Sequence, residues 1–359
     1  MHDRQLSLFD LLDENRSHVI SASPELWTVE EVCKRYYRFK LSDGCSAFFL
    51  DSAKRHLMYF MDWLRNKGFD PVKKKLSDLN SAMLSDFRQI LAANLKISTV
   101  TANLYINHVR MLLFWAENIH GLPHPPIGVI RKFRKNKSVK KGHGKKHDRS
   151  AISWDELEKL FAVAGVVDTA LLLLGLNCGF GNTDIGTLKL CDVDLDAATV
   201  SHPRPKTGVE RNFYLWPEMV DVLRTYIKNY RGKPVNEKGA ELVFVGRRGN
   251  PLCWEQIDEN GNYKRSDSIK VRFRRLYGKA GLKRPYGRGY YSMRHTFATL
   301  IGFGSNDLRE VQAALGQRTI SIQDVYRHDR SQKAIKAQKR IHGQLRKTNI
   351  AEIIHKRCA

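Results

Sequence analysis

The sequence has no long run of apolar residues, and this absence excludes a helix that crosses a membrane. Its longest apolar stretch, 169–176, is much shorter than the roughly 20 residues that such a helix needs, and the mean hydropathy is −0.44. The N-terminus is polar and of mixed charge, unlike a secretory signal. We therefore expect a cytoplasmic protein with no membrane partner.

The six cysteines include no CxxC pair, so their spacing predicts neither a disulfide framework nor a zinc site. Six reduced thiols are typical of a cytoplasmic protein. The 13 histidines are scattered, and His143 and His147 fall in a lysine-rich stretch that is more typical of a solvated linker than of a metal site. We expect neither a metal ion nor another cofactor.

Negative charge is scarce. Lys and Arg number 61 against 37 Asp and Glu, which gives a net charge of +24 and a pI near 9.8. Such a field favours a polyanionic partner, either nucleic acid or an anionic membrane. No segment combines a basic face with an exposed apolar stripe, so we favour nucleic acid. A generally basic protein without such a partner is the alternative.

The hydrophobic pattern predicts a mainly α-helical chain with a small antiparallel β-sheet. Capping boxes at Thr28 and Ser153 open two helix-rich blocks. We expect a polar lead-in over 1–23, a helical domain over 24–122 and a basic linker over 123–152. A second, α+β domain should follow over 153–330, and a C-terminal helix with a tail over 331–359. In the first block the pattern predicts helices over about 46–67, 82–95 and 99–119.

In the second block, apolar periodicity and turn residues predict both helices and strands. The helices fall at about 154–163, 167–176, 217–230, 268–280, 291–303, 307–315, 319–326 and 331–346. The strands fall at 193–195, 198–202, 211–216 and 241–245. The loop Lys206-Thr-Gly208 turns a hairpin between the second and third of these strands.

The segment 131–149 holds ten Lys and Arg and one Asp. It contains too few apolar residues to pack, so it reads as a linker that lies on phosphates, or alternatively as a solvated charge run. The basic residues that we expect to contact DNA are Arg131, Lys132, Arg134, Lys135, Lys137, Lys140, Lys141, Lys145 and Lys146.

Several motifs occur in a fixed order in the second block. Tyr291-Ser-Met-Arg294-His295-Thr-Phe-Ala-Thr precedes Asp307-Leu-Arg-Glu-Val-Gln312 and Ala314-Leu-Gly-Gln317, and Tyr326 follows Gln317 by nine residues. Upstream lie Leu174-Gly-Leu176, the run from Asp184 to Asp194, Lys206-Thr-Gly208, Arg211 and Leu215-Trp-Pro217. Together they resemble the tyrosine recombinase, or phage integrase, family over about 153–330. The N-terminal helical block resembles the core-binding domain of that family.

The resemblance implies site-specific DNA recombination or integration through a 3′-phosphotyrosyl intermediate. Bond energy is conserved in this exchange, so neither ATP nor metal is needed. Double-stranded DNA is the implied partner, which would place a bacterial protein at the nucleoid. Assembly into dimers and tetramers on DNA is implied as well. The helix after Tyr326 would then dock on a neighbouring protomer, or alternatively on its own domain or on DNA.

The resemblance also implies residue roles. Tyr326 would be the nucleophile, Arg294 a phosphate clamp and Lys206 the proton donor to the leaving oxygen. The alternatives are a buried helix tyrosine, a surface ion pair and a plain phosphate contact. Tyr291 stands where the family usually has histidine, and Gln317 stands where it has histidine or tryptophan. Both side chains can still donate hydrogen bonds.

One departure from the family is more serious. The first catalytic arginine should fall at or near Gly181, yet the stretch 177–184 contains no arginine. Loss of one such donor costs on the order of 10²–10³ in rate. Residues that could fill the gap are Asn182, Arg204, Arg211 and Arg288.

The sequence leaves two main interpretations open. Either strand transfer persists with another group in the gap, or the fold is kept for DNA binding alone. A type IB topoisomerase and an unrelated basic RNA-binding protein are weaker alternatives, because neither explains the ordered motifs and the nine-residue spacing.

Overall fold

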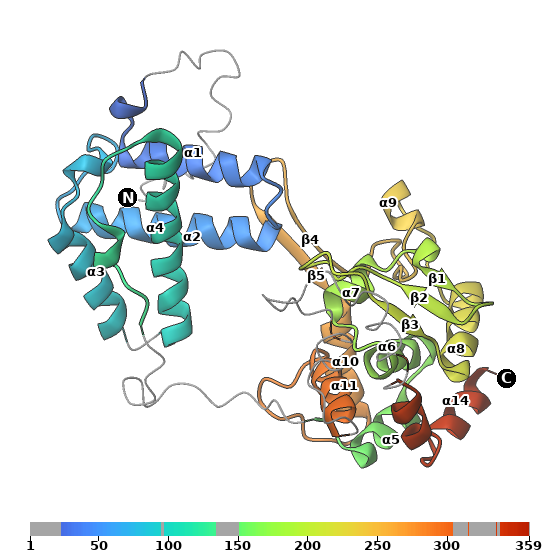
Figure 1. Cartoon of the computed structure of the whole chain (residues 1–359). Helices are drawn as coiled ribbons and strands as arrows, with labels where there is room; N and C mark the ends of the chain where they lie inside the picture. The colour runs from blue at the N-terminus through green and yellow to red at the C-terminus, as the bar shows by residue number, and fades with distance from the viewer. Residues whose placement is uncertain are drawn as a thin grey trace, which may run out of the picture. The chain divides into compact units, whose positions relative to one another are not determined.

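The computed structural model describes residues 23–94, 97–133, 151–303, 315, 335 and 338–358 (Figure 1). The chain divides into two compact units. The first contains Met1–Gly144 and Glu255–Lys264, and the second contains Lys145–Trp254 and Arg265–Ala359. Each unit has its own hydrophobic core.

The first unit is built from four α-helices around one core. They are α1 (Val29–Ser42), α2 (Ala47–Asn66), α3 (Ser81–Ala93) and α4 (Thr99–His120). Each begins at a side-chain cap, and the Thr28 capping box is present as predicted. Gly121 ends α4 in the left-handed conformation that favours glycine. The helices predicted from the sequence here are confirmed to within a few residues.

The segment after α4 packs against the helices for another ten residues or so, rather than leaving them at once. Ile130 is fully buried, and Nη1 of Arg110 donates to the carbonyls of Ile127 at 3.2 Å and Ile130 at 3.1 Å. Phe133 exchanges hydrogen bonds with Asn103. Residues 127–133, which follow the prolines, are therefore anchored on the helices of this unit.

The second unit surrounds a helix that is apolar on every side. This helix is α6 (Val166–Asn177), and ten of its residues are buried. A helix that is hydrophobic all round belongs in the centre of a core. The other helices described in this unit are α5 (Trp154–Val163), α7 (Asn182–Thr187), α8 (Pro217–Asn229), α9 (Glu237–Ala240), α10 (Ser268–Lys279), α11 (Ser292–Phe303) and α14 (Ile350–Cys358).

Two small antiparallel sheets accompany these helices. The first has the order β1 (Val193–Asp194), β2 (Thr199–Ser201) and β3 (Asn212–Tyr214), with Val200 paired to both Val193 and Phe213. The second is a hairpin of β4 (Cys253–Ile257) and β5 (Tyr263–Asp267), whose outer part, 255–264, groups with the first unit. The predicted fold class, mainly helical with a small antiparallel sheet, is confirmed.

The prediction of a strand over 241–245 is wrong, and the β4–β5 hairpin was missed. In the first case only isolated bridges form, between Leu242 and Lys189 and between Val245 and Pro251. Val243 and Phe244 are fully buried, so the apolar run reflects core packing without a ladder. The hairpin lacks a buried face, which removes the alternation that identifies a strand.

The described part of the C-terminal segment packs on its own unit, which is one of the alternatives to docking on a neighbouring protomer. Ile341 and Leu345 are buried in the same core as α6. The Gln338 side chain donates to the carbonyls of Asn177 and Tyr214 and accepts from the amide of Tyr214. Residues 338–345 therefore present their apolar face to their own domain.

Candidate active site

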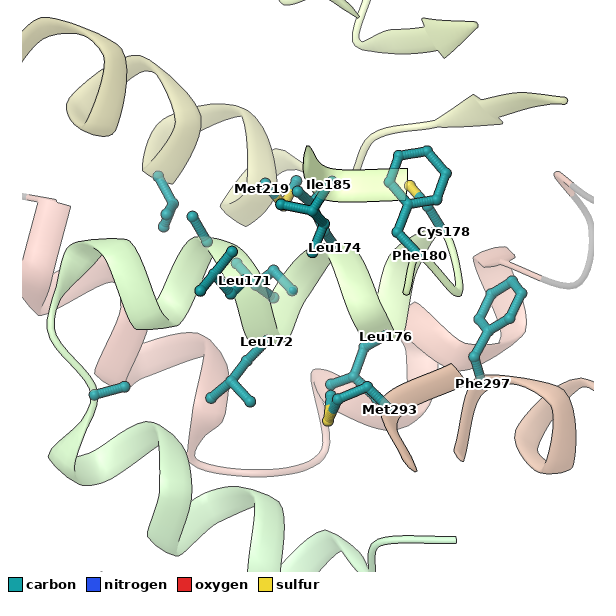
Figure 2. Close-up of a cluster of buried hydrophobic side chains, with 14 of the residues drawn as sticks. Leu171, Leu172, Leu174, Leu176, Cys178, Phe180, Ile185, Met219, Met293 and Phe297 are labelled. Atoms are coloured by element: carbon teal, nitrogen blue, oxygen red, sulfur yellow. The ribbon is translucent and has the colours of Figure 1, made fainter. Parts of the chain in front are cut away.

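Glycines bring the loop after α6 against α11. A Cβ at Gly175 would lie 2.6 Å from Cβ of Met293, and a Cβ at Gly179 would lie 2.3 Å from Cδ1 of Phe297. Gly179 also has a φ of +62°, which disfavours other residues. Figure 2 shows Met293 beside Leu176 and the ring of Phe297 on the α11 side of this cluster. Because of this close approach, the loop 178–181 packs against the first turns of α11.

Arg294 projects from the first turn of α11 into this loop. Its residue is only 4% exposed, Nη1 donates to the carbonyl of Gly179 at 3.0 Å, and Nη2 donates to the carbonyl of Leu315. Burial lowers the pKa of Arg294, and the positive charges of Arg204 and Arg211 lower it further. The guanidinium is thus fixed in place by two carbonyls, and the negative charge of Asp184 opposes the lowering of its pKa.

Asp184 is the carboxylate at the centre of the cluster. Its Oδ1 accepts from Nη2 of Arg211 at 2.7 Å, and its Oδ2 accepts from the amide of Gly181 at 2.8 Å. The same Oδ2 lies 3.7 Å from Nη1 of Arg294. Asp184 therefore caps α7 and links two arginines. Sequence reasoning passed over this residue, although a carboxylate at the third position of a short helix signals a capping role.

Arg211 lies at the start of β3 with its side chain fully buried. Its Nε donates to the carbonyl of His202 at 3.2 Å, and its guanidinium stacks over Phe180 at 4.9 Å. Nη1 is buried and has no hydrogen-bond partner among the residues that the structure describes. Nη2 of Arg211 thus binds Asp184, whereas its Nη1 can still donate a hydrogen bond to another group.

Positive charges gather around one carboxylate in this cluster. Asp184 pairs with Arg211 and Arg294, and the charges of Arg204 and Arg211 both act on Arg294. Lys206 adds a further positive charge on the adjoining hairpin. Two buried guanidinium groups that share one carboxylate suit an anion with several oxygens, such as a phosphodiester.

Lys206 occupies the exposed tip of the loop between β2 and β3. The carbonyl of Arg204 accepts from the amides of Thr207 and Gly208, and the amide of Arg204 donates to Val209. These bonds form a turn with Lys206 inside it, and Gly208 has a φ of +65° that suits the turn. The ammonium is therefore presented to solvent on a hydrogen-bonded support.

A buried histidine anchors the base of this hairpin. Nδ1 of His202 lies 2.8 Å from Oδ2 of Asp192, and its Nε2 lies 3.4 Å from Oγ1 of Thr187. His202 is only 4% exposed, so the pair ties the hairpin to α7. The sequence offered no motif for this contact, which depends on the register of β1 against β2.

Tyr291 lies directly over Gly181, the position where the arginine is absent. A Cβ at Gly181 would be 3.3 Å from Cδ2 and 3.4 Å from Cε2 of the Tyr291 ring. Tyr291 is 50% exposed, and its ring packs edge-to-face on His295 with a centroid distance of 5.2 Å. The two departures from the expected pattern are therefore in contact.

The four residues considered as replacements for the arginine fall into two groups. Arg204 and Arg211 lie with Arg294 in the cluster. Nδ2 of Asn182 instead donates to both oxygens of Asp267, at 2.9 and 3.1 Å. Nη1 of Arg288 pairs with both oxygens of Glu156 at 3.0 Å. The side chains of Asn182 and Arg288 therefore bind carboxylates that lie outside the cluster.

Some predicted site residues lie outside the described part of the chain. They are Tyr326, Gln317, Arg134, Lys135, Lys137, Lys140, Lys141, Lys145 and Lys146. Of the basic stretch, Arg131 and Lys132 are described, and both are exposed. The predictions for the other basic residues, for the nucleophile and for Gln317 remain predictions.

Metal ligands do not gather anywhere in the described ranges, where no group of three or more His, Cys, Asp or Glu side chains is placed to hold an ion. Across the same ranges, none of the helices has the length and hydropathy needed to cross a membrane. All six cysteines are described, and each is a free thiol.

Comparisons with known proteins agree on one family. Residues 151–333 match the sequence model of the Phage integrase family. The chain is 26% identical over 290 residues to the tyrosine recombinase XerD of Ralstonia nicotianae, covering 80% of this chain and 86% of the relative. It is also 26% identical over 277 residues to the tyrosine recombinase XerA of Saccharolobus solfataricus, covering 75% and 78%.

Solved structures show the same fold. The Tn1549 transposon integrase in complex with a circular intermediate DNA has a TM-score of 0.59 at 16% identity, covering 81% of this chain and 92% of that chain. A lambda integrase dimer bound to a core site has a TM-score of 0.55 at 16% identity, covering 82% and 97%. A lambda integrase tetramer bound to a Holliday junction also has a TM-score of 0.55, covering 90% of each chain.

Proposed function

Because the chain belongs to the phage integrase family, we propose that it is a site-specific DNA recombinase that cleaves and rejoins strands through a 3′-phosphotyrosyl intermediate. Its partner is double-stranded DNA, as in the solved complexes of the lambda and Tn1549 integrases. Self-association on DNA follows the lambda integrase dimer and tetramer. The chain acts where its DNA lies, which in a bacterium is the cytoplasm.

The reaction exchanges one phosphodiester for another. The Tyr326 oxygen forms a bond to phosphorus while the bond from phosphorus to the 5′ oxygen breaks. The phenol proton leaves to solvent, and the 5′ oxygen takes a proton from the Lys206 ammonium. Attack by a second 5′-hydroxyl reverses both transfers, so no net oxidation or hydrolysis occurs. A phenol with a usual pKa near 10 needs this support at neutral pH.

The observation that carries the proposal is the arginine cluster beside the hairpin lysine. The transition state gathers negative charge on the phosphoryl oxygens, and fixed cations stabilise it. Arg294 is held by two carbonyls, and Arg211 has an unused buried donor beside it. Lys206 stands on a turn that starts at Arg204, a member of the same cluster. This arrangement supplies charge, position and a proton from adjoining elements.

A second function, DNA binding without cleavage, has a specific observation in its favour. Gly181 supplies no guanidinium, and both Nη atoms of Arg294 are already bonded to backbone carbonyls. A phosphate would have to displace at least one of these bonds. The two functions differ in one product, because only the recombinase forms a covalent protein–DNA adduct.

The test is recovery of covalently bound DNA. The full chain is expressed in the presence of its source DNA, the complexes are denatured, and the attached DNA is sequenced. We expect a recurring junction with the wild-type chain and none with Tyr326→Phe, which should still bind duplex with a steep dependence on salt. Absence of adduct from the wild type, with salt-sensitive binding intact, would establish the binding function in place of recombination.

Lys206→Ala separates proton donation from phosphate contact. We expect cleavage of a defined junction to fall by about 10²–10⁴, the usual contribution of a general acid, while DNA affinity changes little. The matched control is Lys228→Ala, which removes an exposed lysine from α8. Equal losses of cleavage and affinity in Lys206→Ala would reduce its role to a phosphate contact.

A further inference from the structure

Gly181 is a glycine for reasons of space and not of backbone conformation. Its φ of −95° and ψ of −178° are open to any residue. What limits the position is the ring of Tyr291, which a Cβ at 181 would meet at 3.3–3.4 Å, together with Oδ2 of Asp184 at 3.4 Å. At these distances an added Cβ would require the Tyr291 ring to shift by a few tenths of an ångström, and a longer side chain would have to pass the ring. The residue at 181 therefore depends on the residue at 291.

Tyr291 is suited to act where it lies. Its hydroxyl has no hydrogen bond to any residue in the described ranges, and half of the residue is exposed. The ring is held from two sides, by Gly181 beneath it and by the edge-to-face contact with His295. Arg294 follows three residues later on the first turn of α11, and Tyr291 interacts electrostatically with it. A positioned phenol O–H thus adjoins the arginine cluster.

We propose that Gly181 and Tyr291 are a coupled pair in which the phenol takes the place of the absent arginine. The ring fills the space over Gly181, and the hydroxyl donates a hydrogen bond to a non-bridging oxygen of the scissile phosphate. The charge that a phenol cannot supply comes from Arg294 and Arg211. This inference rests on the proposed recombinase function and names a catalytic residue within it.

The size of the effect follows from the donor that is lost. Removal of one preorganised donor to a developing oxyanion costs about 10²–10³ in rate. Tyr291→Phe keeps the ring over Gly181 and removes only the hydroxyl, so cleavage should fall by about 10²-fold while DNA affinity stays within about twofold. Tyr230→Phe is the matched control, because Tyr230 is similarly exposed at 52% but lies at the end of α8.

The coupling is tested by a double-mutant cycle. Gly181→Arg alone places a side chain against the Tyr291 ring and should lower both cleavage and thermal stability. Tyr291→His alone replaces the phenol with a smaller imidazole and should slow cleavage. The double variant relieves the contact and restores two donors, so its cleavage rate should exceed the product of the single effects by at least about tenfold. Its melting temperature should return toward that of the wild type.

The outcomes separate this inference from the proposed function. If the wild-type chain forms the covalent adduct and Tyr291→Phe cleaves at the same rate, the phenol is not the donor and the inference fails while the recombinase function stands. If the cycle is additive in both rate and melting temperature, the two positions are not coupled. If the wild type forms no adduct, the proposed function itself fails, and the donor role of Tyr291 fails with it.

Discussion

The first unit contains two buried histidines whose protonation should weaken it. His56 on α2 and His108 on α4 are 4% and 3% exposed, and their ring centroids lie 5.0 Å apart. Burial lowers the pKa of each from 6.5 to about 4, and the nearby Arg55 charge lowers both further. Nδ1 of each ring is buried without a hydrogen-bond partner in the described part of the chain. Both rings are therefore neutral at pH 7.

The sign and size of the effect follow from linkage. Because the folded pKa is lower than the unfolded value, the unfolded chain binds more protons between pH 4 and pH 6.5. Stability is therefore complete above this window and is lost as the pH falls through it. The pKa of each histidine is 6.5 in the unfolded chain and about 4 in the folded chain. Each histidine therefore lowers the free energy of unfolding by about 2 kcal/mol between pH 7 and pH 5, and the pair lowers it by about 4 kcal/mol.

The assay is amide hydrogen exchange on the full chain, corrected for the intrinsic effect of pH on exchange. The opening free energy of peptides from α2 and α4 should fall by about 4 kcal/mol between pH 7 and pH 5. His108→Leu should reduce this dependence to about 2 kcal/mol, whereas His355→Gln, at an exposed position on α14, should leave it unchanged. A wild-type change below about 1 kcal/mol would refute the reasoning.

Two further predictions concern the second unit. Arg211→Met leaves a buried carboxylate without its closest partner and should destabilise the chain by about 3–5 kcal/mol; a loss below about 1 kcal/mol in urea unfolding would show that the pair is dispensable. Gly179→Ala and Gly281→Ala both place alanine at positive φ, +62° and +66°, but only the first meets a ring, while the second has open space. Gly281→Ala should lower the free energy of unfolding by about 1 kcal/mol, and Gly179→Ala should lower it by about 1–3 kcal/mol more. Equal losses in urea unfolding would mean that the Phe297 ring moves aside freely.

Local signals accounted for most of the helices. The capping boxes at Thr28 and Ser153 and the stop at Gly121 are each decided by residues within one turn, so the sequence alone identifies them. The run 241–245 misled because a short buried segment looks the same whether or not it pairs with a strand. The 253–267 hairpin was missed because none of its strand residues is buried, so neither face stands out as apolar.

The site was predictable in its parts but not in its arrangement. Motif spacing singled out Lys206, Arg211, Arg294 and Tyr291, yet it could not show that Arg211 is tied to Asp184. That contact depends on the packing of β3 against α7, which places Arg211 next to Asp184. Likewise, nothing local links a glycine after α6 to a tyrosine before α11, because their contact is produced by the packing of those two helices.

The contact between Tyr291 and Gly181 also constrains how such a site can change over evolutionary time. A tyrosine introduced at 291 while a long side chain still stood at 181 would contact that side chain, whereas glycine could arise first beside the smaller histidine. The permitted order of substitutions therefore runs through glycine. Related sequences should accordingly vary at these two positions together, with tyrosine at 291 only where 181 is glycine.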